Sequence, residues 1–242
     1  MTAEAHPPGE PVVADVDSPV ELERLLTRWG LGGRPVLVSV GGAGSMGEDA
    51  LRTIEVLLAD HVLPLLHDLG AVVVDGGTDA GVMAAMGRAR QEKQDVDLVG
   101  VVARGTVHAP GTGSGPDAAT LDPQHSHQVL VPGDSWGDES PWISRVAGAI
   151  SAGRASVTLV GNGGGITLQD IDHSLRAGRP VVVLAGSGRT ADLVAAARDD
   201  PAQAEPRVRA LAGSPLLHVV PVDDAARLTG LLRRLLTDTC TP

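Results

Sequence analysis

Four glycine-rich segments contain the residue types best suited to binding a phosphorylated ligand. Their sequences are GGAGSMG (41–47), DGGTDAG (75–81), GNGGG (161–165) and GSGR (186–189). Glycine lets a phosphate approach the main chain, and a helix that begins after such a loop offers free N–H groups and a positive dipole end. Four such loops are hard to explain as turns alone, so we expect a phosphate- or ribose-bearing ligand here.

Three side chains near these loops complete the predicted binding set. Trp136 lies in a turn before a helix, where its ring would either stack on an adenine or anchor the loop on the core. Arg145 lies one turn into that helix, and Arg189 begins another helix, where a cation opposes the dipole and favours a nearby anion. The predicted ligand-binding residues are Gly42, Gly44, Gly76, Gly77, Thr78, Gly81, Trp136, Arg145, Gly163, Gly164, Gly165, Thr167, Gly186, Ser187, Gly188 and Arg189.

Other familiar kinds of site are not indicated. Gly42, Gly44 and Gly47 spell the dinucleotide fingerprint G-x-G-x-x-G, which is weak by itself, and no hydride-transfer site accompanies it. There is neither a P-loop G-K-[ST] nor a G-x-S-x-G elbow. His125 and His127 flank a serine without a third ligand at natural spacing, so we predict structural hydrogen bonding, no metal and no required cofactor.

Each glycine loop follows an apolar, β-branched run and precedes an amphipathic stretch. This alternation predicts an α/β protein: a Rossmann-like, doubly wound, mostly parallel sheet with helices on both faces. The glycine loops would then share the carboxyl edge of the sheet, where such folds bind ligands. The expected strands are 36–40, 71–75, 97–103, 127–131, 156–160, 180–186 and 216–220.

The predicted organisation is one domain behind a short N-terminal segment. Residues 1–33 are expected to be a tail, mobile over 1–17, and a helix over 19–29, followed by a single nucleotide-binding domain over 34–238. Within the domain we expect a helix over 46–69 that bends near Pro64. The long stretch 104–127 is too polar for a core element and is predicted to be a functional loop.

Composition narrows the function classes. The 242 residues are 43% hydrophobic with three Trp and no Phe or Tyr, so the core must consist of Val, Leu, Ile and Ala. A net charge of −11 argues against nonspecific nucleic-acid binding. The single cysteine, Cys240, excludes an internal disulfide. No apolar run approaches the roughly 18 residues of a membrane span, so the expected location is the cytoplasm.

Five segments in this order resemble the SLOG superfamily of Rossmann-like domains, in particular the prokaryotic relatives of the N-terminal cytosolic domain of TRPM channels. They read DGGTDAGVMAAMGRA (75–89), LDPQHSHQVLVPGDSWGDE (121–139), RVAGAIS (145–151), NGGGITL (162–168) and PVVVLAGSGRTADLV (180–194). The channel domains have similar stretches, including a GGTxxGV loop and a DPxHSH strand. The resemblance covers about residues 35–200.

This resemblance implies a cytosolic sensor that binds ADP-ribose or a related NAD-derived nucleotide. By resemblance, the aromatic and the two arginines of such a site would be Trp136, Arg145 and Arg189. The expected partners are a small-molecule nucleotide and either further copies of the chain or a separate effector protein, with no nucleic acid and no membrane.

A second SLOG branch offers an alternative function. The stretch NGGGITLQD is similar to the signature P-G-G-x-G-T-x-x-E of the LOG phosphoribohydrolases, which cleave nucleoside monophosphates. Asn162, Ile166 and Asp170 depart from that pattern. If the chain is such an N-glycosidase, the resemblance makes Asp170 and Arg145 its catalytic pair, although an Asp is one methylene shorter than the usual Glu.

Overall fold

The computed structural model describes residues 10–42, 46–92, 96–108 and 118–237. Gly44, Cys240 and part of the predicted 104–127 loop lie outside these ranges.

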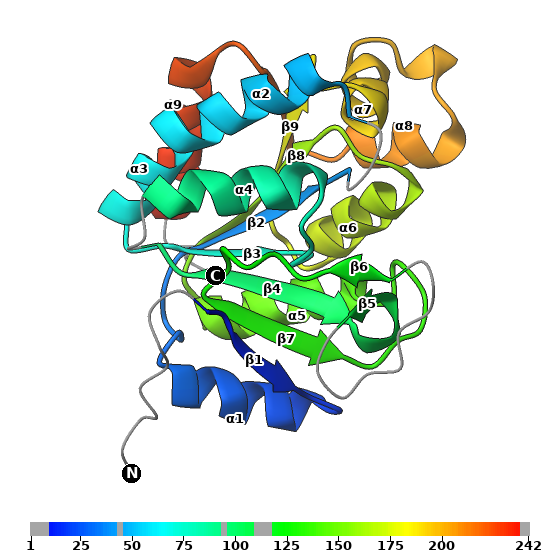
Figure 1. Ribbon diagram of the computed structural model, residues 1–242. Helices are drawn as coiled ribbons and strands as arrows, with labels where there is room; N and C mark the ends of the chain where they lie inside the picture. Colours follow the sequence, from blue (N-terminus) through cyan, green and yellow to red (C-terminus); the bar gives the residue numbers. More distant parts are fainter. Residues whose placement is uncertain (1–9, 43–45, 93–95, 109–117, 238–242) are drawn as a thin grey trace.

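A single parallel sheet of eight strands organises the described chain and confirms the predicted fold class (Figure 1). The strand order is β1-β7-β4-β3-β2-β8-β9-β10, and every neighbouring pair is parallel. Six consecutive strands of the sheet, from β4 to the edge strand β10, therefore have the doubly wound order of a Rossmann fold. The strands are β1 (Val12–Asp15), β2 (Val36–Gly41), β3 (Val72–Asp75), β4 (Leu98–Ala103), β7 (His127–Val131), β8 (Ser156–Gly161), β9 (Val181–Ala185) and β10 (Leu217–Pro221).

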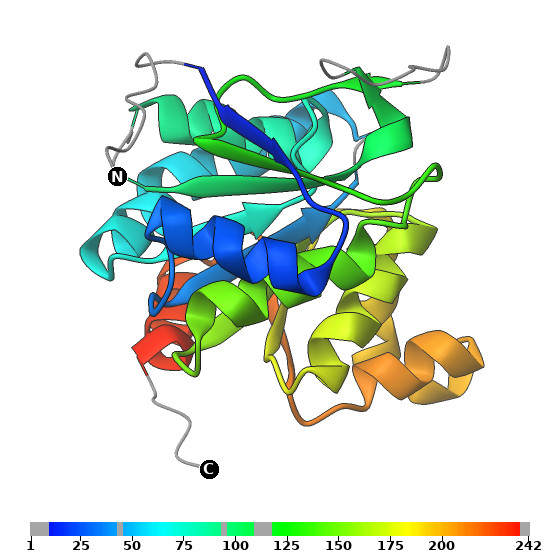
Figure 2. The same cartoon turned by 90° about the horizontal axis from the view of Figure 1, so that it is seen from below.

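Helices cover both faces of this sheet, as Figures 1 and 2 show. One face packs against α1 (Pro19–Trp29), α5 (Ser140–Ser151), α6 (Gly165–Arg176), α7 (Arg189–Asp199) and α8 (Pro206–Ala212). The other packs against α2 (Glu48–Leu57), α3 (Leu63–Asp68), α4 (Gly81–Glu92) and α9 (Ala225–Thr237). Both cores consist largely of Val, Leu, Ile and Ala. An aliphatic core fits strands that are buried on both faces.

The N-terminal segment corrects one expectation. The tail predicted over 1–17 contains β1, which pairs in parallel with β7 from Val12 opposite His127 to Asp15 opposite Leu130. The helix predicted over 19–29 is confirmed, since Ser18 caps its first turn and Gly30 ends it in a left-handed conformation. Pairing with β7 stabilises β1, and the local sequence of β1 has no strong strand pattern from which it could be predicted.

The helix predicted over 46–69 is interrupted rather than merely bent. A π-helical turn, Leu58–Val62, separates α2 from α3 just before Pro64. Proline has no N–H to donate, and its ring clashes with the carbonyl four residues earlier, here that of Asp60. The wider turn relieves that clash and keeps Leu58, Val62 and Leu66 buried in the core.

The predicted loop over 104–127 contains short regular elements. β5 (Val107–His108) pairs in parallel with β6 (Ala119–Thr120), and Leu121 bridges to Thr78. The backbone N–H of Asp122 also donates to the Gly77 carbonyl at 3.0 Å. These contacts fix residues 119–122 against the 75–81 glycine loop.

Candidate functional site

The glycine loops meet where the strand order reverses. In chain order, β2 is followed on one side by β3 and on the other by β8, so the loops after β2 and β8 diverge and leave a crevice. A cavity of about 180 Å³ occupies that crevice. It is lined by Ser39, Val40, Gly41, Gly42, Gly76, Thr78, Met83, Trp136, Glu139, Ile143, Gly164, Gly165, Ile166, Thr167, Asp170 and Arg189.

The structure brings most of the predicted key side chains to this cavity, but not all of them. Nine predicted residues line it: Gly42, Gly76, Thr78, Trp136, Gly164, Gly165, Thr167, Asp170 and Arg189. Seven predicted residues are not among its lining: Gly77, Gly81, Arg145, Gly163, Gly186, Ser187 and Gly188.

Asn162 ties neighbouring loops together, and it accounts for the position of Ser187 and Gly188 in the framework rather than on the cavity lining. Its backbone N–H donates to the Ser187 hydroxyl oxygen at 2.8 Å, and its side-chain amide donates to the Ser187 carbonyl at 2.8 Å. A side chain at Gly42 or Gly188 would come within 2.8 Å of that Asn162 amide. These two glycines therefore permit close packing of three loops, and Ser187 is a buried brace between two of them.

The two segments that carry Asn162 and Arg189 have unusual backbones. Both residues are in the left-handed region, with φ of 58° and 51°. Non-glycine residues held there are concentrated at functional sites. Proline, which the LOG signature has in place of Asn162, has a fixed negative φ and is incompatible with this conformation.

Of the three side chains predicted to complete the site, Trp136 and Arg189 line the cavity and Arg145 does not. Trp136 lies on the cavity lining with 44% of its surface exposed, so its ring is not a buried anchor. The Arg189 guanidinium lies beside Gly164 in the same cavity. Arg145 is exposed on α5 and stacks over the Trp142 ring at 5.9 Å, so the structure does not bring it into the cavity.

Two carboxyl groups, Glu139 and Asp170, share the cavity lining. Burial raises the pKa of Asp170 to about 7; the Ser140 hydroxyl opposes this shift, and the charge of Glu139 adds to it. Burial also raises the pKa of Glu139, although its contact with the Gly137 N–H at 2.9 Å opposes the change. Among the described residues, neither carboxyl forms an ion pair.

Several buried polar atoms on the cavity wall have no hydrogen-bond partner within the described chain. They are Ser39 Oγ, Thr78 Oγ1 and Asp170 Oδ1. Buried polar groups in proteins are nearly always hydrogen-bonded, so an exception calls for an explanation. Three exceptions on one small cavity are consistent with partners supplied by a ligand or by water.

A second acidic group lies beneath the 75–81 loop and is arranged differently. His125 lies between Asp75 and Asp122, with its Nε2 2.7 Å from Asp75 Oδ1 and its Nδ1 3.5 Å from Asp122 Oδ2. Burial by itself would lower the pKa of His125, but the charges and hydrogen bonds of the two carboxylates together raise it to about 9. The histidine is therefore a buried cation that holds the two acids together.

This cluster confirms structural hydrogen bonding for His125. Asp75 Oδ1 also accepts the Gly77 N–H at 2.8 Å, which secures the turn after β3. Its side chain is fully buried and does not line the cavity. His127 makes separate contacts, with the Ser126 hydroxyl at 2.9 Å and the Trp29 ring at 4.6 Å between centroids.

Sequence patterns missed Glu139, Ser39 and the apolar residues Met83, Ile143 and Ile166 of the cavity lining. Glu139 had a weak signal, since it directly precedes the α5 helix in the segment with Trp136. Residues 10–42, 46–92, 96–108 and 118–237 contain no group of three or more acidic, histidine or cysteine side chains suited to a metal. Within the same ranges, no helix has both the length and the apolar character needed to cross a bilayer.

The fold and this crevice define a Rossmann-like domain of the nucleotide-binding kind. Residues 34–229 match the family model described as SLOG in TRPM, prokaryote, and the chain belongs to this family.

Relatives in sequence agree with that placement. The chain is 26% identical over 219 residues to transient receptor potential cation channel subfamily M member 2 of Rattus norvegicus, covering 75% of this chain and 14% of the channel. It is 27% identical over 219 residues to transient receptor potential cation channel subfamily M member-like 2 of Nematostella vectensis, covering 74% of this chain and 14% of that protein. The chain thus spans only about a seventh of these relatives.

A solved structure with a similar fold is the molybdenum cofactor carrier protein of Chlamydomonas reinhardtii. The TM-score is 0.52 at 18% identity, over 84% of this chain and 98% of the carrier. At this identity the likeness supports the shared fold alone.

Proposed function

We propose that this chain binds ADP-ribose or a related NAD-derived nucleotide in the crevice between β2 and β8. The observation that carries the proposal is the set of unpartnered, buried polar atoms on the cavity wall, Ser39 Oγ, Thr78 Oγ1 and Asp170 Oδ1. A ribose presents hydroxyl groups that both donate and accept hydrogen bonds, so it can satisfy hydroxyls and a carboxyl at once. The function needs no further cofactor.

Charge gives the ligand an orientation. Arg189 and the N-terminus of α6 at Gly164 and Gly165 favour an anion, so the phosphates belong on that side. Burial raises the pKa of both Glu139 and Asp170, so these two carboxyls suit the hydroxyl groups of the uncharged ribose.

The size of the cavity places the base at its rim. About 180 Å³ is less than the 300 Å³ or more of a typical drug-sized pocket, so the cavity encloses only part of a nucleotide. Trp136 is half-exposed on the lining, where its ring can stack on a base, a contact worth about 1–3 kcal/mol.

Titration calorimetry with ADP-ribose tests this proposal. Wild type is expected to bind, and Arg189→Ala is expected to weaken binding by about tenfold or more, since hydrogen bonds to charged groups contribute about 1.5–3 kcal/mol. Arg176→Ala is the matched control, because Arg176 is exposed on α6 and outside the lining. No binding by wild type, or equal loss in both variants, would overturn the proposal.

Asp170 favours a second candidate function, hydrolysis of the N-glycosidic bond of a nucleoside monophosphate. With a pKa of about 7, its carboxyl can hold a proton at neutral pH and release it to a leaving base. In that step the bond between C1′ and the base nitrogen breaks, the base takes the proton, and the oxygen of a water bonds to C1′ as its proton returns to Asp170. Arg189, rather than Arg145, would then hold the phosphate.

The two candidates differ in their products. AMP incubated with wild type releases adenine only if the chain is a hydrolase, and Asp170→Asn should then abolish release. Intact AMP after prolonged incubation, together with ADP-ribose binding, rejects hydrolysis and leaves the binding function.

A further inference from the structure

We infer that Gln128 is a positioning residue for the nucleotide site, which orients the Gly77–Thr78 peptide so that the backbone N–H of Thr78 is available to the ligand. Gln128 lies on β7, two strands away from β3 and its loop, and it does not line the cavity. The inference rests on the proposed function, because it adds a donor to the same crevice and names the side chain that orients this donor.

Gln128 is a fully buried polar side chain within the sheet. The three residues that follow it on β7 are buried and apolar, and Gln128 itself is 0% exposed. A buried amide is unfavourable unless it is hydrogen-bonded. The Gln128 Nε2 donates to the Gly77 carbonyl at 3.0 Å and to the Asp122 carbonyl at 3.3 Å. The side chain therefore joins the 75–81 loop to the segment that contains Asp122.

Two glycines make room for this side chain. The strand register places Gln128 opposite Gly100 of β4, and Gly100 opposite Asp75 at the end of β3. Paired residues of neighbouring strands point to the same face, and Gly100 has no side chain, so Gln128 can cross β4 and reach the loop after β3. A Cβ atom at Gly100 or at Gly77 would collide with the Gln128 Oε1.

The Gly77 carbonyl is held by two donors. One is the Gln128 Nε2, and the other is the Asp122 N–H at 3.0 Å. Gly77 has φ of 64°, a left-handed conformation that glycine adopts easily. The Gly77–Thr78 peptide bond is trans, so the Thr78 N–H points opposite to this carbonyl, away from Gln128 and Asp122.

The Thr78 N–H has no partner within the part of the chain that the structure describes. The bridge between Thr78 and Leu121 is formed by neighbouring backbone groups, such as the Asp79 N–H, which donates to the Thr120 carbonyl at 2.9 Å. Thr78 is nevertheless 1% exposed, and its Oγ1 also lacks a partner among the described residues. Buried N–H groups without a partner are rare. Because Thr78 lines the cavity, a ligand oxygen can accept both donors.

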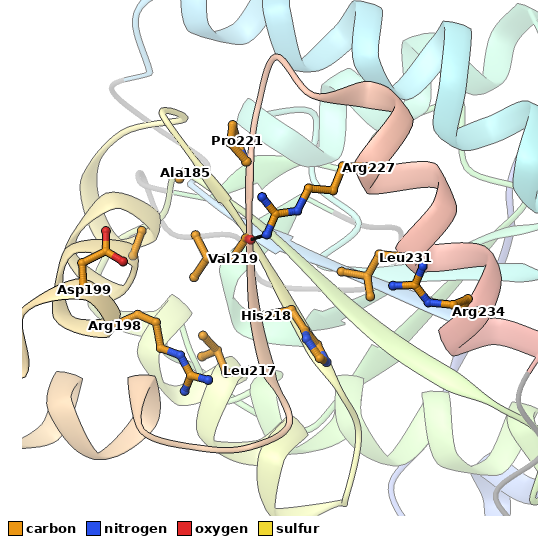
Figure 3. Close-up of a pocket in the computed structure, with 11 residues that line it drawn as sticks. Ala185, Arg198, Asp199, Leu217, His218, Val219, Pro221, Arg227, Leu231 and Arg234 are labelled. Atoms are coloured by element: carbon orange, nitrogen blue, oxygen red, sulfur yellow. Dashed lines mark hydrogen bonds between the residues drawn. The ribbon is translucent and has the colours of Figure 1, made fainter.

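The groove beside β10, drawn in Figure 3, shows the opposite arrangement. There the Leu217 N–H donates to the Ser214 carbonyl at 3.2 Å, and the Val219 carbonyl accepts the Arg227 guanidinium at 3.3 Å. These backbone groups are already bonded within the chain. The comparison favours a ligand at Thr78 over a ligand along the edge of β10.

Gln128→Met tests the role of the side chain, because methionine has a similar length and cannot donate to Gly77. Titration calorimetry should show that ADP-ribose binds about fivefold or more weakly than to wild type, as expected for the loss of a hydrogen bond that orients the loop. Gln124→Met is the matched control. The Gln124 side chain forms no hydrogen bond with the described residues, so this change should leave the affinity nearly unchanged.

Hydrogen exchange measured by NMR separates positioning from general destabilisation. In wild type, saturating ADP-ribose should slow exchange of the Thr78 amide about tenfold or more. In Gln128→Met at equal saturation this slowing should disappear, whereas the Asp79 amide should stay protected by its bond to Thr120.

Gln128→Glu supplies a second variant of nearly the same shape. Its carboxyl can donate to Gly77 only when protonated, so relative to wild type at each pH it should bind ADP-ribose more tightly at pH 5 than at pH 8. Gln128→Met should lack this trend, and thermal midpoints confirm that each variant folds.

The outcomes distinguish the two proposals. Absence of ADP-ribose binding by wild type overturns the proposed function, and this inference with it. Binding by wild type overturns the positioning role alone if the Thr78 amide does not respond to the ligand, or if Gln128→Met binds as tightly as wild type.

Discussion

Two groups of acidic side chains near the glycine loops have opposite arrangements. Asp75 and Asp122 enclose a buried histidine cation, whereas Glu139 and Asp170 line a cavity without an ion pair in the described structure. In the first group the acids contact the histidine, and Asp75 also accepts the Gly77 N–H that secures the loop. In the second the charged form is disfavoured, which destabilises the free protein and leaves the groups available. The presence or absence of a compensating cation thus distinguishes the acids of the framework from the acids that line the cavity.

Removing the buried cation should have the largest effect. His125→Gln leaves Asp75 and Asp122 buried near each other without compensation, and breaking such a buried pair costs about 3–5 kcal/mol. Urea denaturation at pH 7 measures the loss of unfolding free energy. His61→Gln, at an exposed position, is the control and should change stability little. A small change in both variants would show that the cluster does not hold the framework.

The wild-type protein should lose stability as the pH rises from about 6.5 to about 9. The folded-state pKa of His125, about 9, exceeds the ordinary value of 6.5, so the folded state holds this proton more tightly. Its contribution is complete below pH 6.5 and disappears as the pH passes 9, a loss of about 2–3 kcal/mol. Urea denaturation across this range should show the loss in wild type and a much flatter dependence in His125→Gln. Equal slopes would contradict the assignment.

Removing the negative charge of Asp170, which lines the cavity, should raise the stability of the free protein rather than lower it. Asp170 has a folded-state pKa of about 7, above its ordinary 3.8, so its contribution to stability falls as the pH rises from about 4 to 7. Asp170→Asn should therefore stabilise the free protein at pH 8 by about 1–2 kcal/mol while weakening nucleotide binding.

Asp172→Asn is the matched control for that gain. Asp172 lies on the same helix, paired with Arg176 near the surface, and its replacement should cost under about 0.5 kcal/mol. Destabilisation by Asp170→Asn would place Asp170 with the framework group instead.

The smallest effect expected concerns Trp136. Since its ring is half-exposed, Trp136→Ala should leave the thermal midpoint nearly unchanged and weaken ADP-ribose binding about fivefold or more, as expected for loss of one base–aromatic contact. Calorimetry and thermal denaturation measure the two quantities. A large fall in the midpoint with unchanged affinity would make the ring a loop anchor.

Local patterns predicted the sheet because most of the buried strands are short, β-branched runs, and β2, β3, β8 and β9 lead directly into glycine loops. They missed β1, whose place depends on pairing with β7, a contact over a hundred residues away. They also could not show that the turn before Pro64 widens, since that depends on keeping Leu66 in the core.

The sequence predicted those parts of the candidate site that the glycine-rich loops form. Glycine spacing located the crevice, and Trp136, Asp170 and Arg189 meet there. Glycine spacing could not show that Gly188 packs against Asn162 outside the cavity lining, whereas Gly42 both packs against Asn162 and lines the cavity. Arg145 was predicted at the site, but its position on α5 turns it toward Trp142. Glu139 acquires its role only through its proximity to Asp170 in space.

The most direct test of the contrast is a carbon-13 NMR titration of the aspartate carboxyls, with and without ADP-ribose. The account predicts that Asp170 titrates near pH 7 and that ADP-ribose shifts its resonance, while the resonances of Asp75 and Asp122 do not respond to the nucleotide. If Asp170 titrates near its ordinary value and is indifferent to ADP-ribose, or if Asp75 and Asp122 respond instead, the account is contradicted.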